Sequence, residues 1–348
     1  MVKRRPFTKS HSRHLPSSPL STSRWFVLWG CFLMLFVQGG ARFSFGVMFK
    51  PMITELGWDR GDISLAFFLN MAVFALTMSV AGKLYDRYGP KWVLLISSAC
   101  FATGYLLIGR MSSLWEFHFY YGVLAAVGFG GVSVPLLSAL IGQWFDKRRG
   151  LAISQTLAGS CLGQFALVPP VDRLVAAYGW RSAYVAMGIV VVVVNCIIIL
   201  CVIRKKSAPT GEGEISLGTA APVEPRDANL RQAARTGSFW LFAMVMFICG
   251  SGDFLVSAHL VAIATDHGIA SVTAANMLAW YGLMGMAGLL VVGPVSDAVG
   301  NKWPLVLTFV LRCLLFGMIL VFKTKLAFYL FAIFFGFTFF ITAPLTTT

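Results

Sequence analysis

Four ionisable side chains lie inside long apolar segments of this sequence, where charged groups are least expected. They are Arg42, Asp253, His259 and Arg312. An ionised side chain at the centre of a bilayer costs about 2.5–3.5 kcal/mol on insertion scales, so such residues usually bind a substrate, an ion or one another. An arginine fork can hold a carboxylate at two points, and a histidine changes its charge near neutral pH. The pattern predicts anion binding and proton transfer within a membrane.

Ten apolar segments must position these side chains, each near the roughly 20 residues that cross a bilayer as a helix. The composition agrees, because 57% of the 348 residues are apolar and 12% are charged, whereas soluble domains have about 25% charged residues. We therefore predict an all-α membrane protein and exclude a soluble multidomain one. The expected helices are approximately 25–49, 63–81, 92–110, 117–141, 150–170, 182–203, 237–260, 273–295, 303–322 and 326–345.

The basic residues are distributed unevenly between the loops. With a cytoplasmic N-terminus, the inner tail and loops carry 19 Lys and Arg residues and the outer loops carry 7. Basic loops are retained on the cytoplasmic side of a membrane, so the net charge of +14 reports orientation, and we expect no nucleic-acid partner. The prediction is an integral protein of the cell (inner) membrane, with the lipid bilayer as its surroundings and a cytoplasmic N-terminus.

Motifs for enzymatic chemistry are missing from the sequence. It contains no phosphate-binding glycine loop, no Ser-His-Asp set and no His and Cys cluster with metal-ligand spacing. All seven cysteines fall in apolar stretches without a C-x-x-C pair, so we expect neither a disulfide framework nor a zinc site. We predict that the protein is not an enzyme and uses no cofactor and no metal.

An internal repeat with an offset of 211 residues organises the chain. GKLYDRYGPK at 82–91 matches GPVSDAVGNK at 293–302, and ELG at 55–57 matches DHG at 266–268. Between the two copies, the polar stretch at 204–236 is rich in Gly, Pro and Ala, which indicates a flexible linker. Each half of the sequence is therefore interpreted as a copy of one unit.

The predicted organisation is a disordered cytoplasmic tail at 1–24, a six-helix bundle at 25–203, a cytoplasmic linker at 204–236 and a second bundle at 237–348. The second copy ends within the helix equivalent to 117–141, so we expect a C-terminally truncated chain with four of six helices in that bundle. Parallel repeats with a substrate site near the midplane between them are the architecture of one class of secondary transporters.

The segment at 82–91 resembles the loop 2–3 signature of the major facilitator superfamily. In that family the loop latches the two halves in one access state, and its Asp meets the eleventh helix, which our prediction lacks. Glycines here are expected to allow a tight turn and close helix approach. The second copy has Ala298 in place of the Arg and is expected to be weaker. The resemblance assigns the gating loop to Gly82, Asp86, Arg87, Gly89, Lys91 and Asp297.

WFDKRRGLA at 144–152, followed by Gly159 and Gly163, is similar to the monocarboxylate porter and oxalate/formate antiporter branch of that superfamily. The resemblance covers about residues 25–345. It implies the major facilitator fold of two pseudo-symmetric six-helix bundles, and secondary active transport of a small organic anion by alternating access. Protons or a counter-anion would supply the coupling. Independently of any substrate, the Gly159-x-x-x-Gly163 spacing predicts close helix packing.

The repeat offset relates Arg42 to Asp253, in helices that face each other across the central cavity of this fold. We expect Arg42 to bind the substrate carboxylate and to pair with Asp253 when the site is empty, so that proton uptake by Asp253 releases it. A structural ion pair, or an Arg42 that reaches the outer surface, is the alternative. His259 is a candidate proton relay, with an ordinary interfacial histidine as the alternative. Arg312 is expected to have a structural partner, for which the missing segment is one candidate location.

Two weaker candidates for substrate contact are Asn70 and its repeat equivalent Tyr281. For such residues, hydrogen bonding between helices is the default reading. Three alternatives to an organic-anion transporter remain open. They are a proton-coupled exporter of hydrophobic or cationic compounds, a non-transporting membrane sensor, and an inactive truncated product.

Overall fold

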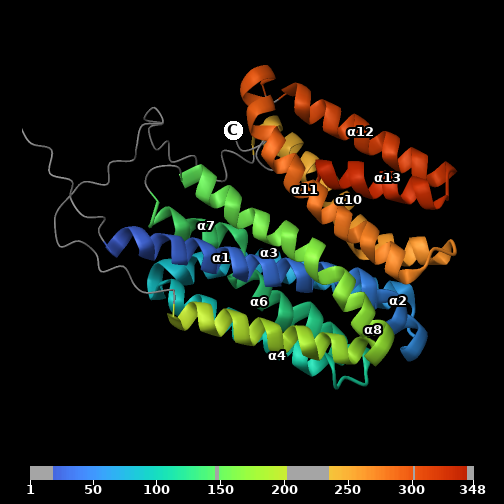
Figure 1. Cartoon of the computed structure of the whole chain (residues 1–348), viewed down its shortest axis with the longest axis horizontal. Helices are drawn as coiled ribbons and strands as arrows, with labels where there is room; N and C mark the ends of the chain where they lie inside the picture. The colour runs from blue at the N-terminus through green and yellow to red at the C-terminus, as the bar shows by residue number, and fades with distance from the viewer. Residues whose placement is uncertain (1–18, 146–148, 202–234, 301, 343–348) are drawn as a thin grey trace, which may run out of the picture.

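The computed structural model describes residues 19–145, 149–201, 235–300 and 302–342, and all of its regular elements there are helices. The first group, coloured blue to yellow-green in Figure 1, comprises α1 (Pro19–Phe43), α2 (Phe45–Leu56), α3 (Arg60–Tyr88), α4 (Pro90–Ile108), α5 (Leu114–Phe117), the π-helix η1 (His118–Ala125), α6 (Ala126–Gly131), α7 (Val134–Gly142) and α8 (Arg149–Cys201). The second group, orange to red, comprises α10 (Gly237–Asp266), α11 (Ser271–Val299), α12 (Lys302–Val321) and α13 (Lys325–Thr338).

The predicted apolar segments are mostly helical within the described residues, with short interruptions such as the turn at 339–341. Eight helices among the described residues are long and apolar enough to cross a membrane. The longest of them, Leu151–Cys201 within α8, covers two predicted segments. Gly179, whose φ of 82° is not helical, marks the kink between the two. The shorter α13 corresponds to the last predicted segment, and α1 and α2 together form the first. This helical membrane architecture confirms the predicted fold class.

Glycines with positive φ end the helices at equivalent points of the two copies. Gly57 has φ 67° and its equivalent Gly268 has φ 79°, while Gly89 has φ 83° and Gly300 has φ 78°. Only glycine adopts this region without a steric penalty. The backbone N–H of Gly89 also donates a hydrogen bond to the Tyr85 carbonyl. The repeat is therefore expressed in backbone geometry as well as in residue type.

The predicted gating loop is mostly helix. Lys, Leu and Arg are good helix formers, so α3 continues through Gly82, Asp86 and Arg87 to Tyr88. Only Gly89, followed by Pro90 at the first position of α4, ends it. A Cβ on Gly82 would meet no atom within 4 Å, so our prediction that Gly82 allows a turn or a close approach was wrong. The turn depends on Gly89 alone.

Small residues bring α1 and α8 together. A Cβ at Gly159 would collide with the Phe32 carbonyl, and one at Gly163 would collide with the Phe36 carbonyl. The close packing predicted from the Gly-x-x-x-Gly spacing is thus confirmed. It also fixes α8 beside α1, the helix that carries Arg42.

Aromatic and branched side chains pack into separate clusters within the two groups of helices. The two clusters of the first group are centred on side chains such as Phe101 and Leu137, and the main cluster of the second group on Phe335. This last cluster also takes in Phe43 and Val168 from the first group. The two groups are therefore joined by apolar packing as well as by polar contacts.

Most of the predicted tail and most of the predicted linker lie outside the described residues, at 1–18 and 202–234. The first helix begins at Pro19, earlier than the predicted residue 25, and α10 begins at Gly237. The proposed division into tail, bundles and linker stays a prediction.

Candidate functional site

A small cavity lies between the two groups of helices, next to Arg42. Its volume is about 170 Å³. Side chains from both groups line it, namely Leu35, Gln38, Gly39, Arg42, Phe43, Phe74, Ser133, Val134, Pro135, Leu157, Ser160, Phe254, Phe339 and Phe340. The walls are largely aromatic and aliphatic, with a few hydroxyl and amide groups and one cation. Such a mixture is typical of small-molecule sites.

Aromatic rings surround the Arg42 guanidinium. Its central carbon lies 4.6 Å from the ring centre of Phe74, 5.1 Å from that of Phe254 and 5.7 Å from that of Phe129. These distances suit cation–π attraction. The Nη2 atom contacts the Met71 sulfur at 2.9 Å, and Nε has no hydrogen-bond partner within the described part of the chain. No ion pair between described residues includes Arg42.

The partner of Asp253 is Arg312 and not Arg42. The Arg312 Nη2 atom lies 2.9 Å from Asp253 Oδ1, and the side chains are only 6% and 8% exposed. Our prediction of an Arg42–Asp253 pair was therefore wrong for this structure. Arg312 does have the structural partner that we expected, and that partner, Asp253, lies on α10.

The helical geometry of α10 explains this difference. Neighbouring residues on a helix point about 100° apart. Phe254 faces Arg42 across the cavity, so the adjacent Asp253 is turned away from Arg42 and toward Arg312 on α12. An offset between repeats identifies equivalent positions, but it does not say that two equivalent side chains point toward each other.

Further polar groups complete the Asp253–Arg312 cluster. Arg312 Nε and Nη2 donate hydrogen bonds of 2.9 Å to the Thr338 hydroxyl and carbonyl, and Nη1 lies 3.1 Å from Cys249 Sγ. Cys249 Sγ lies 3.4 Å from Asp253 Oδ2. From the sequence we predicted no contact between Cys249 and an ionisable side chain. Its position four residues before Asp253, on the same helix face, was the signal that could have identified it.

Asn70 and Tyr281 are fully buried and do not line the cavity. Asn70 Nδ2 donates a hydrogen bond of 2.6 Å to the Tyr121 carbonyl in η1, which ties α3 to the π-helix. Tyr281 packs between Phe335 and Phe339, and its hydroxyl has no hydrogen-bond partner among the described residues. The structure does not bring either residue to the cavity beside Arg42.

His259 lies apart from the Asp253 cluster. Its ring contacts Phe49 edge-on at 4.9 Å, and it lines a separate pocket between α3 and α10. No hydrogen bond or ion pair between His259 and Asp253 occurs within the described residues. A direct relay between the two side chains has no structural basis here.

The residues of the predicted gating segment point outward. Asp86, Arg87 and Lys91 are exposed, and none of them takes part in an ion pair among the residues that the structure describes. The side chain of Asp297 lies outside the described residues. The gating role of this segment stays a prediction.

A charged clasp at the other end of the molecule was missed by the sequence analysis. Asp266, at the end of α10, accepts from Lys50 Nζ at 2.9 Å and from Arg60 Nη2 at 2.6 Å. Lys50 belongs to α2 and Arg60 to α3, so the clasp joins the two groups of helices. Nearby, Ser271 donates a hydrogen bond of 2.5 Å to Asp172. Only the packing of α2 against α10 could have indicated this contact.

Comparison with known proteins places these features in a family. A sequence model described as Major Facilitator Superfamily matches residues 31–348. Over 330 residues the chain is 26% identical to an uncharacterized MFS-type transporter, YcxA, of Bacillus subtilis (strain 168), which covers 93% of this chain and 79% of that protein. It is 26% identical to the oxalate:formate antiporter of Oxalobacter formigenes over 73% of this chain and 59% of the antiporter.

A third relative is monocarboxylate transporter 13 of Bos taurus, which is 24% identical over 79% of this chain and 62% of the relative. This chain thus spans less than two thirds of the antiporter and of the monocarboxylate transporter. Among solved structures, a D-xylose-proton symporter superposes with a TM-score of 0.69 at 12% identity, over 92% of this chain and 81% of the symporter. A bacterial homolog of the human lysosomal transporter Spinster, in an inward-facing and occupied conformation, gives 0.69 at 15% identity, over 93% and 74%. At these identities the structures show the fold alone.

Proposed function

Because the chain belongs to the Major Facilitator Superfamily, it is an integral membrane transporter, and we propose that it moves a small organic anion such as a monocarboxylate. The observation that carries this proposal is Arg42, a cation that lines the cavity between the two groups of helices. It has no carboxylate partner among the described residues. An arginine fork can bind a carboxylate with two parallel hydrogen bonds. The names of the oxalate:formate antiporter and the monocarboxylate transporters support the same substrate class.

The size of the cavity favours this proposal over export of hydrophobic compounds. Pockets for drug-sized ligands usually measure about 300–1,000 Å³, whereas the cavity beside Arg42 is about 170 Å³. A positive charge in the wall also disfavours a cationic substrate. An anion of a few carbon atoms could place its carboxylate on Arg42 and its apolar part against the aromatic wall.

In an alternating-access cycle, the clasp would determine the side of the membrane with which the cavity exchanges substrate. Asp266, Lys50 and Arg60 close the end of the molecule that holds the α2–α3 and α10–α11 turns. With the N-terminus in the cytoplasm, that end faces outward, and the cavity would exchange substrate with the inner side in this state. Release of the clasp, and a movement of one helix group against the other, would open the outer path. The excess of basic residues in the inner loops supports this orientation and a location in the inner membrane.

Coupling to protons would involve Asp253. Proton uptake by its carboxyl group would break the ion pair with Arg312 and free α10 to move against α12. Phe254, the next residue of α10, contacts Arg42, so a movement of α10 would change the substrate cavity as well. Exchange against a second anion, without protons, is the other coupling mode that this arrangement allows.

Transport by the purified protein in proteoliposomes tests the substrate class. We expect radiolabelled lactate, formate or oxalate to enter, with competition by other small carboxylates and none by organic cations of similar size. Arg42→Ala should reduce uptake at least about tenfold, because the ionic contact to the carboxylate is lost, and Arg42→Lys should restore only part of it. Undiminished carboxylate uptake by Arg42→Ala would contradict the proposal.

The coupling role has its own test. Asp253→Asn keeps the shape of the side chain but cannot ionise. It should abolish uptake driven by a pH gradient while exchange of internal for external carboxylate continues. Full gradient-driven uptake by this variant would contradict the role of Asp253 without affecting that of Arg42.

A further inference from the structure

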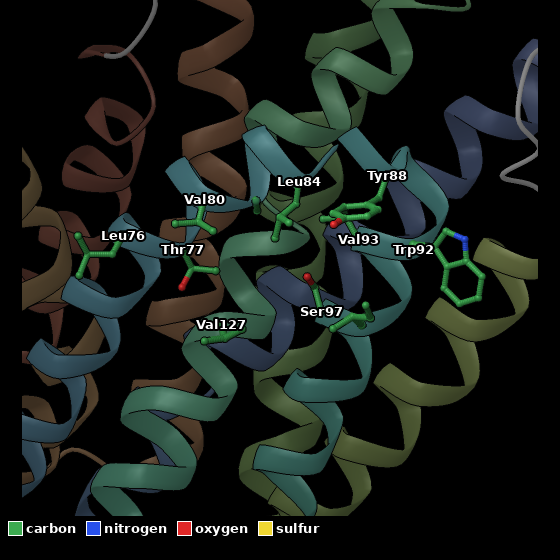
Figure 2. Close-up of a pocket in the computed structure, with 11 residues that line it drawn as sticks. Leu76, Thr77, Val80, Leu84, Tyr88, Trp92, Val93, Ser97 and Val127 are labelled. Atoms are coloured by element: carbon green, nitrogen blue, oxygen red, sulfur yellow. The ribbon is translucent and has the colours of Figure 1, made fainter. Parts of the chain in front are cut away.

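A long apolar groove runs along the membrane-facing surface between α3 and α4 (Figure 2). Its volume is about 630 Å³. Val80 and Leu84 of α3 and Ile96 of α4 line it and are exposed, and Val127 of α6 lies at its base (Figure 2). Tyr88 and Trp92, on the two sides of the α3–α4 turn, line its end and are 56% and 61% exposed. Aromatic side chains of this kind gather where a membrane meets water.

The second copy of the repeat forms an equivalent groove between α11 and α12. Its volume is about 460 Å³. Residues that lie 211 positions apart line the two grooves, so that Val291 matches Val80, Val295 matches Leu84 and Trp303 matches Trp92. The two grooves therefore have equivalent wall residues and an equivalent tryptophan, and each groove lies in its own copy of the repeat.

The sequence next to the lining residues differs in charge between the two grooves. At the first groove, Lys83 precedes the groove residue Leu84, Arg87 precedes Tyr88 and Lys91 precedes Trp92. These three cations are exposed, and no ion pair holds any of them within the described residues. The equivalent positions of the second copy are occupied by Pro294, Ala298 and Lys302. An Asp occurs at the equivalent positions 86 and 297 of both copies, so the sequence beside the first groove has two additional positive charges.

We propose that the groove between α3 and α4 binds an anionic phospholipid, with an acyl chain along the apolar wall and the phosphate on Lys83, Arg87 and Lys91. The chain spans a membrane, so lipid is the medium that meets these exposed walls. The three cations attract the phosphate of an anionic lipid, and a lipid without net charge is not attracted in this way. This binding depends on membrane insertion only and not on the substrate or the coupling mode proposed above.

The other groove makes this proposal specific. If the apolar shape alone decided binding, neither groove would distinguish an anionic lipid from a neutral one. Each basic residue near a membrane surface strengthens attraction to anionic lipid by about fivefold, and two additional cations act beside the first groove. Phosphatidylglycerol should therefore favour the first groove over the second by roughly 25-fold, and phosphatidylcholine should favour neither.

Photo-crosslinking in nanodiscs tests the proposal. The full chain is reconstituted in phosphatidylcholine discs that contain a trace of either phosphatidylglycerol or phosphatidylcholine with a photoreactive acyl chain. Labelled peptides are then quantified by mass spectrometry at 76–97 and at 291–308. We expect phosphatidylglycerol to label the first region in excess, and the triple variant Lys83→Gln, Arg87→Gln and Lys91→Gln to lose that excess. Its labelling by phosphatidylcholine should not change, which also shows that the variant is folded.

Two controls make the outcome decisive. Lys302→Gln changes the only described cation at the equivalent positions beside the second groove and should leave labelling of the first groove unaltered. Val80→Trp fills the first groove without changing its charge and should reduce labelling there by both lipids. The proposal is overturned by equal phosphatidylglycerol labelling of the two grooves, by excess labelling that survives in the triple variant, or by labelling that Val80→Trp does not reduce. Absence of lipid labelling from the first groove, as a second protein copy seated there would produce, overturns it as well.

Discussion

At the scale of single residues, the arginines within the apolar helices α1 and α12 differ in what neutralises them. Arg312 lies 2.9 Å from the Asp253 carboxylate and donates hydrogen bonds to Thr338. Arg42 has aromatic rings and a methionine sulfur around it. In a poorly solvated site, a cation with an ion pair is satisfied, whereas one without a carboxylate partner remains available to an anionic ligand. This contrast supports the proposals that Arg42 binds the substrate and that Arg312 has a structural or coupling role.

The buried ion pair gives a prediction for stability. Arg312→Ala and Asp253→Ala should each lower the free energy of unfolding by about 3–5 kcal/mol, because each leaves its partner as an uncompensated buried charge. The double variant should lose less than the sum of the two, since neither charge remains. The free energy of unfolding of the two single variants and the double variant is measured in mild detergent, with tryptophan fluorescence as the readout. Lys323→Ala, which removes an exposed cation, is the control and should change stability by no more than about 0.5 kcal/mol. Additive losses in the double variant would show that the two side chains do not interact.

At the scale of elements, contacts between the two helix groups are polar and specific at one end. Asp266 on α10 meets Lys50 on α2 and Arg60 on α3, and Gln164 of α8 donates a hydrogen bond of 2.9 Å to the Leu278 carbonyl of α11. Exposed ion pairs contribute only about 0–1 kcal/mol each. Contacts of this strength can hold one state of a transporter and still be broken in every cycle.

The clasp predicts the behaviour of the turns that it joins. Asp266→Asn removes the charge that both cations share, so the clasped state should become less populated. Hydrogen–deuterium exchange of the α2–α3 and α10–α11 turns should then become faster, with little change in α4. Asp59→Asn is the matched control, because Asp59 is exposed in the same region and has no ion pair among the described residues. Equal exchange in the two variants would show that the clasp does not hold this end closed.

At the scale of the whole molecule, the repeat places two similar helix groups side by side (Figure 1), and side chains from both groups line the cavity beside Arg42. The copies share the positions of their turn glycines and their lipid-facing grooves. They differ in their ionisable residues, because the equivalent of Arg312 is Phe101, a core residue. The two halves thus share an architecture but differ in their ionisable side chains.

Orientation in the membrane gives a prediction at this scale. A protease recognition sequence inserted after Gly213, which lies outside the described residues, should be cleaved in inside-out vesicles and protected in right-side-out ones. The reason is the concentration of basic residues on that side. A second insertion after Ser112, in the turn between α4 and α5, should give the opposite pattern and serves as the control. Cleavage of both insertions from the same side would contradict the predicted topology.

Much of the fold could be predicted from the sequence because its causes are local. An apolar stretch near 20 residues must satisfy its backbone hydrogen bonds internally in lipid, so it forms a helix wherever it is placed. The glycines at 57, 89, 268 and 300 turn the chain because φ is positive there, and Gly159 and Gly163 admit a neighbouring helix. Type and spacing were sufficient to predict the turn at Gly89 and the packing at Gly159 and Gly163, and they also carried the family resemblance.

The pairing of side chains depended on the tertiary structure. Arg42, Asp253 and Arg312 were identifiable as buried charges, but which of them meet is decided by rotation about each helix axis and by the packing of α10 against its neighbours. The Asp266 clasp joins residues more than two hundred positions apart, and no local pattern encodes such a contact. The sequence determined which residues are costly to place in a membrane. Only the tertiary structure decided their partners, because electrostatic attraction and hydrogen bonding act over a few ångströms in space and not along the chain.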